Sequence, residues 1–296
     1  MNYVITGSLG HISKPIVSGL VKQGHQVSVI TSSESRVKDI EALGAKALLG
    51  LLNDASFVSQ SFKGANAVYL MIPPSFAVTD WRGYQRQVGD IFVNAIRENN
   101  IKYAVVLSSI GAHLGDGAGP IDGLYDLEKA LTKVHGLNVV NLRPSYFYYN
   151  LFAQIPTIKA LNFMGANFGS TDEKLVLTDT NDIAEAALEE LSDLTFKGQT
   201  VRYIYSDERH PSEIAAVLGK AINKPDLNWV TFPDDQFKQG LLSAGLNDSI
   251  ANGYTTMGKG IRDGKVQEDY WKNKPSKAGK VKLEDFAHAF AAAYNS

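Results

Sequence analysis

The chain has 296 residues, 44% of them hydrophobic, which suffices for one large domain or two unequal ones around a substantial core. Its 29 basic and 31 acidic residues give a formal net charge of −2, which argues against electrostatic binding of nucleic acid or an anionic membrane. The absence of cysteine excludes disulfides, thiolate nucleophiles and metal–thiolate centres. Any redox chemistry therefore needs a bound cofactor.

Neither a targeting signal nor a membrane span is expected. Residues 1–7 lack a basic leader and resemble the start of a strand. The longest apolar runs, residues 67–74 and 103–107, are far shorter than the about 20 residues that cross a bilayer. We therefore expect a soluble, cytoplasmic protein.

Short β-branched segments alternate with longer amphipathic segments through the first half of the chain. This alternation predicts β-α-β units, and consecutive apolar positions predict strands buried on both faces of a parallel sheet. The predicted strands are residues 3–6, 26–31, 45–49, 67–72, 103–108 and 138–142, and the predicted helices are residues 12–22, 35–43, 54–62, 84–99 and 125–134. The expected fold class is α/β, a doubly wound parallel sheet of the Rossmann type.

The pattern is less regular after Pro144. Further strands are predicted at residues 175–177 and 201–205, further helices at 182–191, 212–222 and 283–294, and loops at 258–264 and 273–280. We expect a dinucleotide-binding domain over residues 1–150, to which strands return from about residues 175–206, and a smaller α/β substrate-side domain over residues 151–296.

A glycine-containing turn directly follows the first predicted strand. A turn this tight needs positive φ or close backbone approach at Gly7 and Gly10, and the following helix start offers N–H groups to a pyrophosphate. Ser13 stands where a third glycine is usual, so slightly looser packing is expected. An ordinary turn without a ligand is the alternative. The residues assigned to cofactor binding here are Gly7, Leu9, Gly10, His11 and Ile12.

The end of the second predicted strand bears on the choice of cofactor. Residues 27–33 contain no carboxylate for a ribose 2′-hydroxyl. Thr31, Ser32, Ser33 and Arg36 offer hydroxyls and a cation to a 2′-phosphate, so they favour NADP(H) over NAD(H). Arg36 fits a solvated helix face equally well.

Five segments in a characteristic order carry a family resemblance. They are the glycine turn, residues 64–69 with Pro73 and Pro74, residues 107–113, the segment from Leu142-Arg143-Pro144 to Asn150, and residues 182–184. With them the chain resembles the NmrA-like branch of the atypical short-chain dehydrogenase/reductases. The resemblance implies an NADP-type Rossmann domain with a small C-terminal part over the nicotinamide. Ser32 and Leu51-Leu52 depart from the arginine and aspartate frequent in the family, which affects the adenosine side.

Tyr125 and Lys129 have the Tyr-x-x-x-Lys spacing of short-chain dehydrogenases. There an ammonium one helical turn away lowers the pKa of a tyrosine that exchanges a proton with a carbonyl. Tyr270 and Lys274 share this spacing, so chance is an alternative. The candidate catalytic residues are Tyr125, Lys129, Ser109 and His113.

Residues after the predicted strand ends complete the candidate site. Met71, Ile72, Pro73, Ser108 and Tyr146 are further candidates for cofactor contact, and Pro74, Phe76, Phe147, Tyr149 and Asn150 for a substrate pocket. An apolar, aromatic pocket suits a flat uncharged electrophile. The aromatic side chains fit a hydrophobic core equally well.

Two other motifs are set aside. Gly253 to Lys259 have the spacing of a phosphate loop, but Gly260 replaces the hydroxyl residue and no strand precedes the motif. His113, Asp116 and Asp122 lack the spacing of a known metal site, so no metal is expected.

The sequence thus predicts an NADPH-dependent oxidoreductase that transfers hydride to a quinone or another apolar carbonyl or electrophile. One alternative is an NADP(H)-sensing regulator that acts on a protein partner without turnover. Another is a sugar-nucleotide epimerase, which would require Tyr125 and Lys129 to be catalytic.

Overall fold

The computed structural model describes residues 1–170 and 172–296. These form two compact units. The first comprises Met1–Ser109, Gly123–Arg143 and Ile183–Arg202, and the second Ile110–Asp122, Pro144–Asp182 and Tyr203–Ser296. No helix in the described part of the chain is long and apolar enough to cross a membrane.

A seven-stranded sheet in the order β10-β6-β5-β4-β1-β2-β3 organises the first unit. β1 pairs in parallel with both β2 and β4, and the ladder continues in parallel to β3 on one side and to β5 and β6 on the other. The strands are β1 (Asn2–Ile5), β2 (Gln26–Thr31), β3 (Lys46–Leu49), β4 (Ala67–Leu70), β5 (Tyr103–Leu107), β6 (Asn138–Pro144) and β10 (Gln199–Ile204). The expected doubly wound α/β fold is confirmed.

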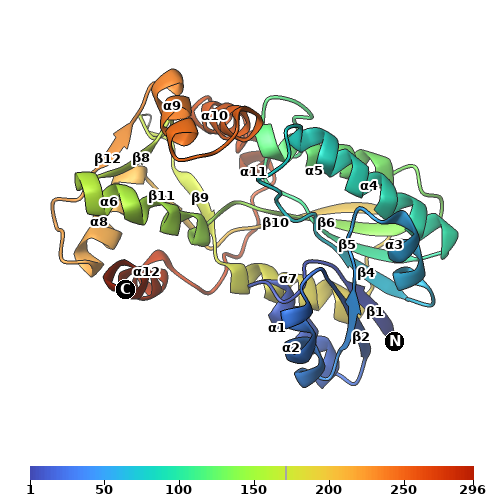
Figure 1. The fold of residues 1–296 in the computed structure, drawn as a ribbon. Helices are drawn as coiled ribbons and strands as arrows, with labels where there is room; N and C mark the ends of the chain where they lie inside the picture. Colours follow the sequence, from blue (N-terminus) through green and yellow to red (C-terminus); the bar gives the residue numbers. More distant parts are fainter. Residues whose placement is uncertain (171) are drawn as a thin grey trace. The chain divides into compact units, whose positions relative to one another are not determined.

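Helices cover both faces of this sheet (Figure 1). The helical segments are α1 (Ser13–Lys22), η1 (Glu34–Arg36), α2 (Val37–Ala42), α3 (Ala55–Phe62), α4 (Trp81–Glu98), α5 (Asp122–Leu131) and α7 (Thr180–Asp193). On one face, Phe62 of α3, Phe92 of α4 and Leu127 of α5 share a buried cluster with Val68 of β4. α1 and α7 pack together on the other face, where Leu188 contacts Gly19.

Two small sheets and a set of helices form the second unit. One sheet has the order β11-β9-β7 and the other pairs β12 with β8. The strands are β7 (Tyr146–Phe147), β8 (Met164–Ala166), β9 (Leu175–Thr178), β11 (Asp207–Arg209) and β12 (Trp229–Thr231), and the helical segments are η2 (Gly119–Ile121), η3 (Tyr148–Gln154), α6 (Ile155–Leu161), α8 (Pro211–Ala221), α9 (Asp234–Ser243), α10 (Asp248–Arg262), α11 (Glu268–Lys272) and α12 (Leu283–Asn295). Tyr148, Ile158, Leu218 and Phe290 are fully buried in its core.

The loop predicted at residues 258–264 is wrong, because α10 continues to Arg262. Gly258 and Gly260 lie within the helix, whereas Gly264, with φ +73°, follows its end. A Cβ atom at Gly258 would lie 1.8 Å from Oδ1 of Asn167, so only glycine lets this side chain lie against the helix. Glycine thus marks close packing here and does not end the helix.

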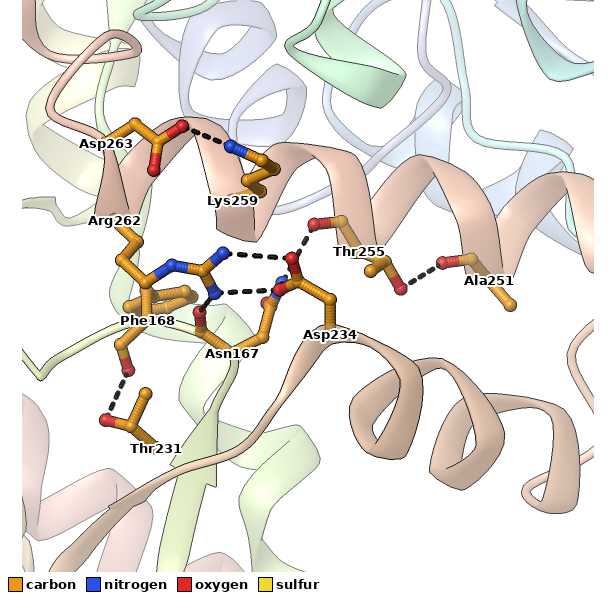
Figure 2. A network of polar contacts seen from close by, with 9 residues as sticks. All are labelled: Asn167, Phe168, Thr231, Asp234, Ala251, Thr255, Lys259, Arg262 and Asp263. Carbon is orange, nitrogen blue, oxygen red and sulfur yellow. Dashed lines mark hydrogen bonds and ion pairs between the residues drawn. The ribbon is translucent and has the colours of Figure 1, made fainter.

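A polar network joins β8, α9 and α10 (Figure 2). The guanidinium of Arg262 donates two hydrogen bonds to the carboxylate of Asp234, at 2.7 and 2.9 Å, and one to the carbonyl of Asn167. The Asn167 amide donates to Asp234 and to the carbonyl of Thr255, both at 2.8 Å. These bonds from Arg262 hold the pKa of Asp234 at about 2, below its ordinary value of 3.8.

We predict that Asp234→Asn lowers the melting temperature near neutral pH. Because the pKa of Asp234 is lowered by folding, its stabilising effect is present above pH about 4 and is lost as the pH falls toward about 2. Thermal unfolding followed by circular dichroism should therefore show a difference between wild type and variant that shrinks with acidification. An equal difference at neutral and strongly acidic pH would contradict this role.

Candidate functional site

The turn between β1 and α1 has a left-handed backbone at two consecutive residues. φ is +90° at Gly7 and +54° at Ser8. A Cβ at Gly7 would lie 2.5 Å from Cε of Met71 and 3.0 Å from Oγ of Ser13. Gly7 is therefore required by its backbone angle and by its neighbours.

Three hydroxyl groups hold this turn. Thr6 Oγ1 accepts a hydrogen bond from the Met71 N–H at 2.7 Å, which joins the ends of β1 and β4. Ser8 Oγ donates to Thr31 Oγ1 at 2.9 Å, which joins the turn to β2. Ser13 is buried and donates to the Thr6 carbonyl at 3.3 Å. The serine in place of the third glycine thus adds a bond across the turn.

The start of α1 has no side-chain cap. Ile12 occupies the N-cap position, and no side-chain oxygen there accepts from the first turn. The Lys14 N–H donates to the Gly10 carbonyl at 3.0 Å and Pro15 has no N–H, and the remaining N–H groups of the first turn carry the positive end of the helix dipole. This end of α1 can therefore receive an anionic group such as a phosphate. Gly10 and His11 are exposed beside it.

A cavity of about 270 Å³ lies at the carboxyl ends of β1 to β4. Its lining includes five of the predicted cofactor residues: Gly7, Thr31, Ser32, Met71 and Pro73. It also includes Ser8, Ile30, Gly50, Leu51, Leu52, Asn53 and Tyr84, which were not predicted. The volume is close to the lower limit for small-molecule sites, about 300 Å³, and suits part of a dinucleotide.

The remaining predicted residues of the cofactor turn and of β2 lie outside this lining. Leu9 and Ile12 are buried in the core. Ser33 shares a 2.8 Å hydrogen bond with Ser35. The Arg36 guanidinium is half exposed and 3.9 Å from Asp39.

The segment between β4 and α4 contains three further predicted residues. Ile72 is buried, and Pro74 is exposed. The ring of Phe76 is 50% exposed and lies 6.1 Å from the ring of Trp81.

Ser108 at the end of β5 belongs to a buried ion-pair network. Its hydroxyl donates to Glu128 of α5 at 2.5 Å. Arg143, at the end of β6, donates to the same carboxylate at 3.1 and 2.7 Å. Glu128 and Arg143 are each about 90% buried, so Glu128 fastens α5 to the ends of two strands.

The predicted tyrosine–lysine pair lies on the same helix. The Lys129 ammonium is 5.6 Å from the centre of the Tyr125 ring, a cation–π distance. Ser109 is half-buried at the end of β5. All three of these residues, Ser109, Tyr125 and Lys129, belong to the first unit.

The second pair with this spacing has a structural role. Tyr270 is completely buried, and its hydroxyl donates to Glu208 at 2.6 Å. Lys274 forms an ion pair with the same carboxylate at 2.7 Å. Tyr270 lies in α11.

The other predicted residues belong to the second unit. His113 is half-buried and interacts electrostatically with Glu268. Burial, with a smaller effect of Tyr254, raises the pKa of Tyr146. Phe147 is half-buried, whereas Tyr149 and Asn150 are exposed. Tyr148, between them, is a core residue that stacks on Phe286 at 5.3 Å.

No metal site accompanies these residues. Within residues 1–170 and 172–296, no group of three or more His, Asp or Glu side chains could hold a metal ion.

Comparison with known proteins identifies the family. The family model of the NmrA-like family matches residues 2–287. The chain belongs to the NmrA-like family. Comparison with curated protein sequences gave no significant match.

Solved structures share the fold of this NmrA-like protein. The NADPH-dependent quinone oxidoreductase of Escherichia coli, complexed with NADPH, has a TM-score of 0.80 and 20% identity, covering 97% of this chain and 99% of that one. The Citrobacter triphenylmethane reductase complexed with NADP(H) has a TM-score of 0.77 and 16% identity, covering 98% and 99%. A nucleoside-diphosphate-sugar epimerase of Staphylococcus aureus has a TM-score of 0.76 and 14% identity, covering 97% and 100%.

We predict that Glu128→Ala lowers the free energy of unfolding by about 3 kcal/mol, because it removes one partner of a buried ion pair. Urea unfolding at neutral pH measures this change. Lys129→Ala, an exposed change on the same helix, is the control and should cost less than about 0.5 kcal/mol. Equal effects of the two substitutions would show that Glu128 does not hold the helix.

Proposed function

We propose that this protein binds NADP(H) at the cavity of the first unit and reduces a quinone or another apolar carbonyl or electrophile. The observation that carries the proposal is the left-handed Gly7–Ser8 turn, which stands between the uncapped start of α1 and this cavity. A phosphate at the helix start and a nucleoside in the cavity fit these features.

The lining of the cavity supports NADP(H) over NAD(H). It contains no Asp or Glu among the described residues, whereas a carboxylate near the end of the second strand commonly binds the ribose of NAD. Ser32 is exposed at this position, and its hydroxyl can donate to a 2′-phosphate. Arg36, on the following turn, would need to leave Asp39 to add a charge.

The family and the fold support reduction as the activity. Two of the similar structures are named a quinone oxidoreductase and a triphenylmethane reductase, and both are complexes with NADPH or NADP(H). Bound NADPH supplies a hydride, so the protein must position the acceptor and provide a proton. We assign proton donation to Tyr125, assisted by Ser109 and Lys129, or to His113.

The acceptor is proposed to bind against apolar and aromatic residues. The candidates in the first unit are Pro74 and Phe76, and the candidates in the second unit, taken by itself, are Phe147, Tyr149 and Asn150. Exposed aromatic side chains next to an amide suit a flat, uncharged molecule with one polar end.

The experiment that tests this function is NADPH oxidation with a panel of quinones and aldehydes. We expect turnover with at least one quinone and a loss of at least about tenfold in kcat/KM for Asn150→Ala, because the amide orients the acceptor. Turnover that survives Tyr125→Phe would assign the proton to water or His113. Tight NADPH binding without turnover would contradict the reductase and favour a cofactor-sensing regulator, and conversion of a sugar nucleotide would favour an epimerase.

The cofactor preference has a separate test. Ser32→Asp should weaken NADPH binding by about tenfold or more and leave NADH binding equal or tighter, because a carboxylate repels the 2′-phosphate and binds a ribose hydroxyl. Titrations followed by nicotinamide fluorescence give both dissociation constants. Parallel weakening of both cofactors would mean that Ser32 does not face the 2′-position.

A further inference from the structure

Tyr84 differs from the other described residues that line the cavity because it belongs to a helix. It is the fourth residue of α4, whereas the others come from the ends of β1 to β4 and the segments after them. No sequence motif includes Tyr84. Its place in the lining therefore calls for a physical explanation.

The first turn of α4 is firmly held. The Asp80 carboxylate accepts from the Gly83 N–H at 2.9 Å, which caps the helix, and Trp81 is buried. Arg82 and Arg86 both donate to Asp126 of α5, with shortest distances of 2.7 Å. These contacts fix the part of the backbone that carries Tyr84.

The ring of Tyr84 continues the apolar face of α4. It packs against the cluster that contains Val88, one helical turn further on, and Phe92. This packing requires only the ring, which phenylalanine would supply equally well. The hydroxyl therefore needs a separate explanation.

Tyr84 lines the cavity, and its hydroxyl is a hydrogen-bond donor. Burial raises the pKa of this phenol, so the group keeps its proton at neutral pH. Within the described chain, no protein group forms a hydrogen bond with its side chain. Polar groups at a ligand cavity that lack a protein partner are suited to a ligand.

The position of the cavity indicates which half of a dinucleotide lies there. In the sheet order, β4, β1, β2 and β3 follow one another, and the cavity lies at their carboxyl ends. Ser109, Tyr125 and Lys129 follow β5 on the opposite side of β4. A cofactor whose nicotinamide is near those residues places its adenosine half between β1 and β3.

We propose that Tyr84 donates a hydrogen bond to the adenosine half of bound NADP(H) and contributes to the affinity for that half. This inference rests on the proposed function. Ile30, Leu51 and Leu52 supply apolar contacts in the same cavity, and the Tyr84 hydroxyl supplies a donor for a ribose, phosphate or purine acceptor.

The test compares Tyr84→Phe with wild type by calorimetric titration of three probes: NADPH, 2′,5′-ADP and reduced nicotinamide mononucleotide. Loss of one hydrogen bond should weaken NADPH and 2′,5′-ADP by about fivefold each and leave the mononucleotide unchanged. Tyr103→Phe is the matched control. Tyr103 is the first residue of β5, whereas the cavity lies at the carboxyl ends of the strands, and its ring packs edge-to-face on Phe196. Its affinities should equal those of wild type.

Three outcomes would overturn the inference, and they are distinguishable. Wild-type affinity of Tyr84→Phe for 2′,5′-ADP removes the role of Tyr84 and leaves the proposed function intact. Weakening of the mononucleotide alone places Tyr84 at the other half of the cofactor. Failure of the wild-type protein to bind NADPH or 2′,5′-ADP defeats the proposed function and this inference together.

Discussion

The left-handed turn at Gly7 and Ser8 is the constraint on which the candidate site depends. It reverses the chain between β1 and α1 without a side chain at Gly7, where Met71 and Ser13 occupy the adjacent space. A non-glycine residue in the left-handed region, as at Ser8, costs about 1 kcal/mol. The hydrogen bonds of Ser8 to the Ile30 carbonyl and to Thr31 offset this cost. The same bonds bring β2 beside the start of α1, and so form the cavity.

In each unit, polar side chains centred on carboxylates hold helices to neighbouring elements. In the first, Glu128 joins α5 to β5 and β6, and Asp126 joins α5 to α4 through Arg82 and Arg86. In the second, Asp234 and Arg262 join α9 to α10 and to the backbone after β8. Hydrogen bonds from arginine hold the pKa of Asp126 in the first unit and of Asp234 in the second below the ordinary value, so acidification weakens one such contact in each unit.

The sheet could be predicted from the sequence because its signal is local. Apolar runs such as residues 103–107 alternate with amphipathic helices, and this pattern alone specifies a parallel, doubly wound arrangement. α10 was not predicted, because glycines within it suggest a loop, whereas Gly258 is needed for packing against Asn167, a partner 91 positions away. No local rule distinguishes these two reasons for glycine.

The candidate site was predictable at the turn and less so elsewhere. Gly7, Ser32 and Met71 follow strand ends, which a parallel sheet gathers at one edge, and all three line the cavity. Asn53 also follows the end of a strand, β3, so the same rule could have identified it as a site residue. Tyr84 carries no such signal, because on sequence grounds it is one member of an amphipathic helix. The burial of Ser108 against Glu128 likewise depends on tertiary packing.

Hydrogen–deuterium exchange with and without NADPH tests the central claim most directly, because it locates the binding site without assuming an acceptor. We expect NADPH to slow amide exchange at the start of α1, around Ser32, in residues 50–53 and in the first turn of α4. Unchanged exchange in these segments at saturating NADPH, or protection confined to the second unit, would contradict the assignment of this cavity to the cofactor.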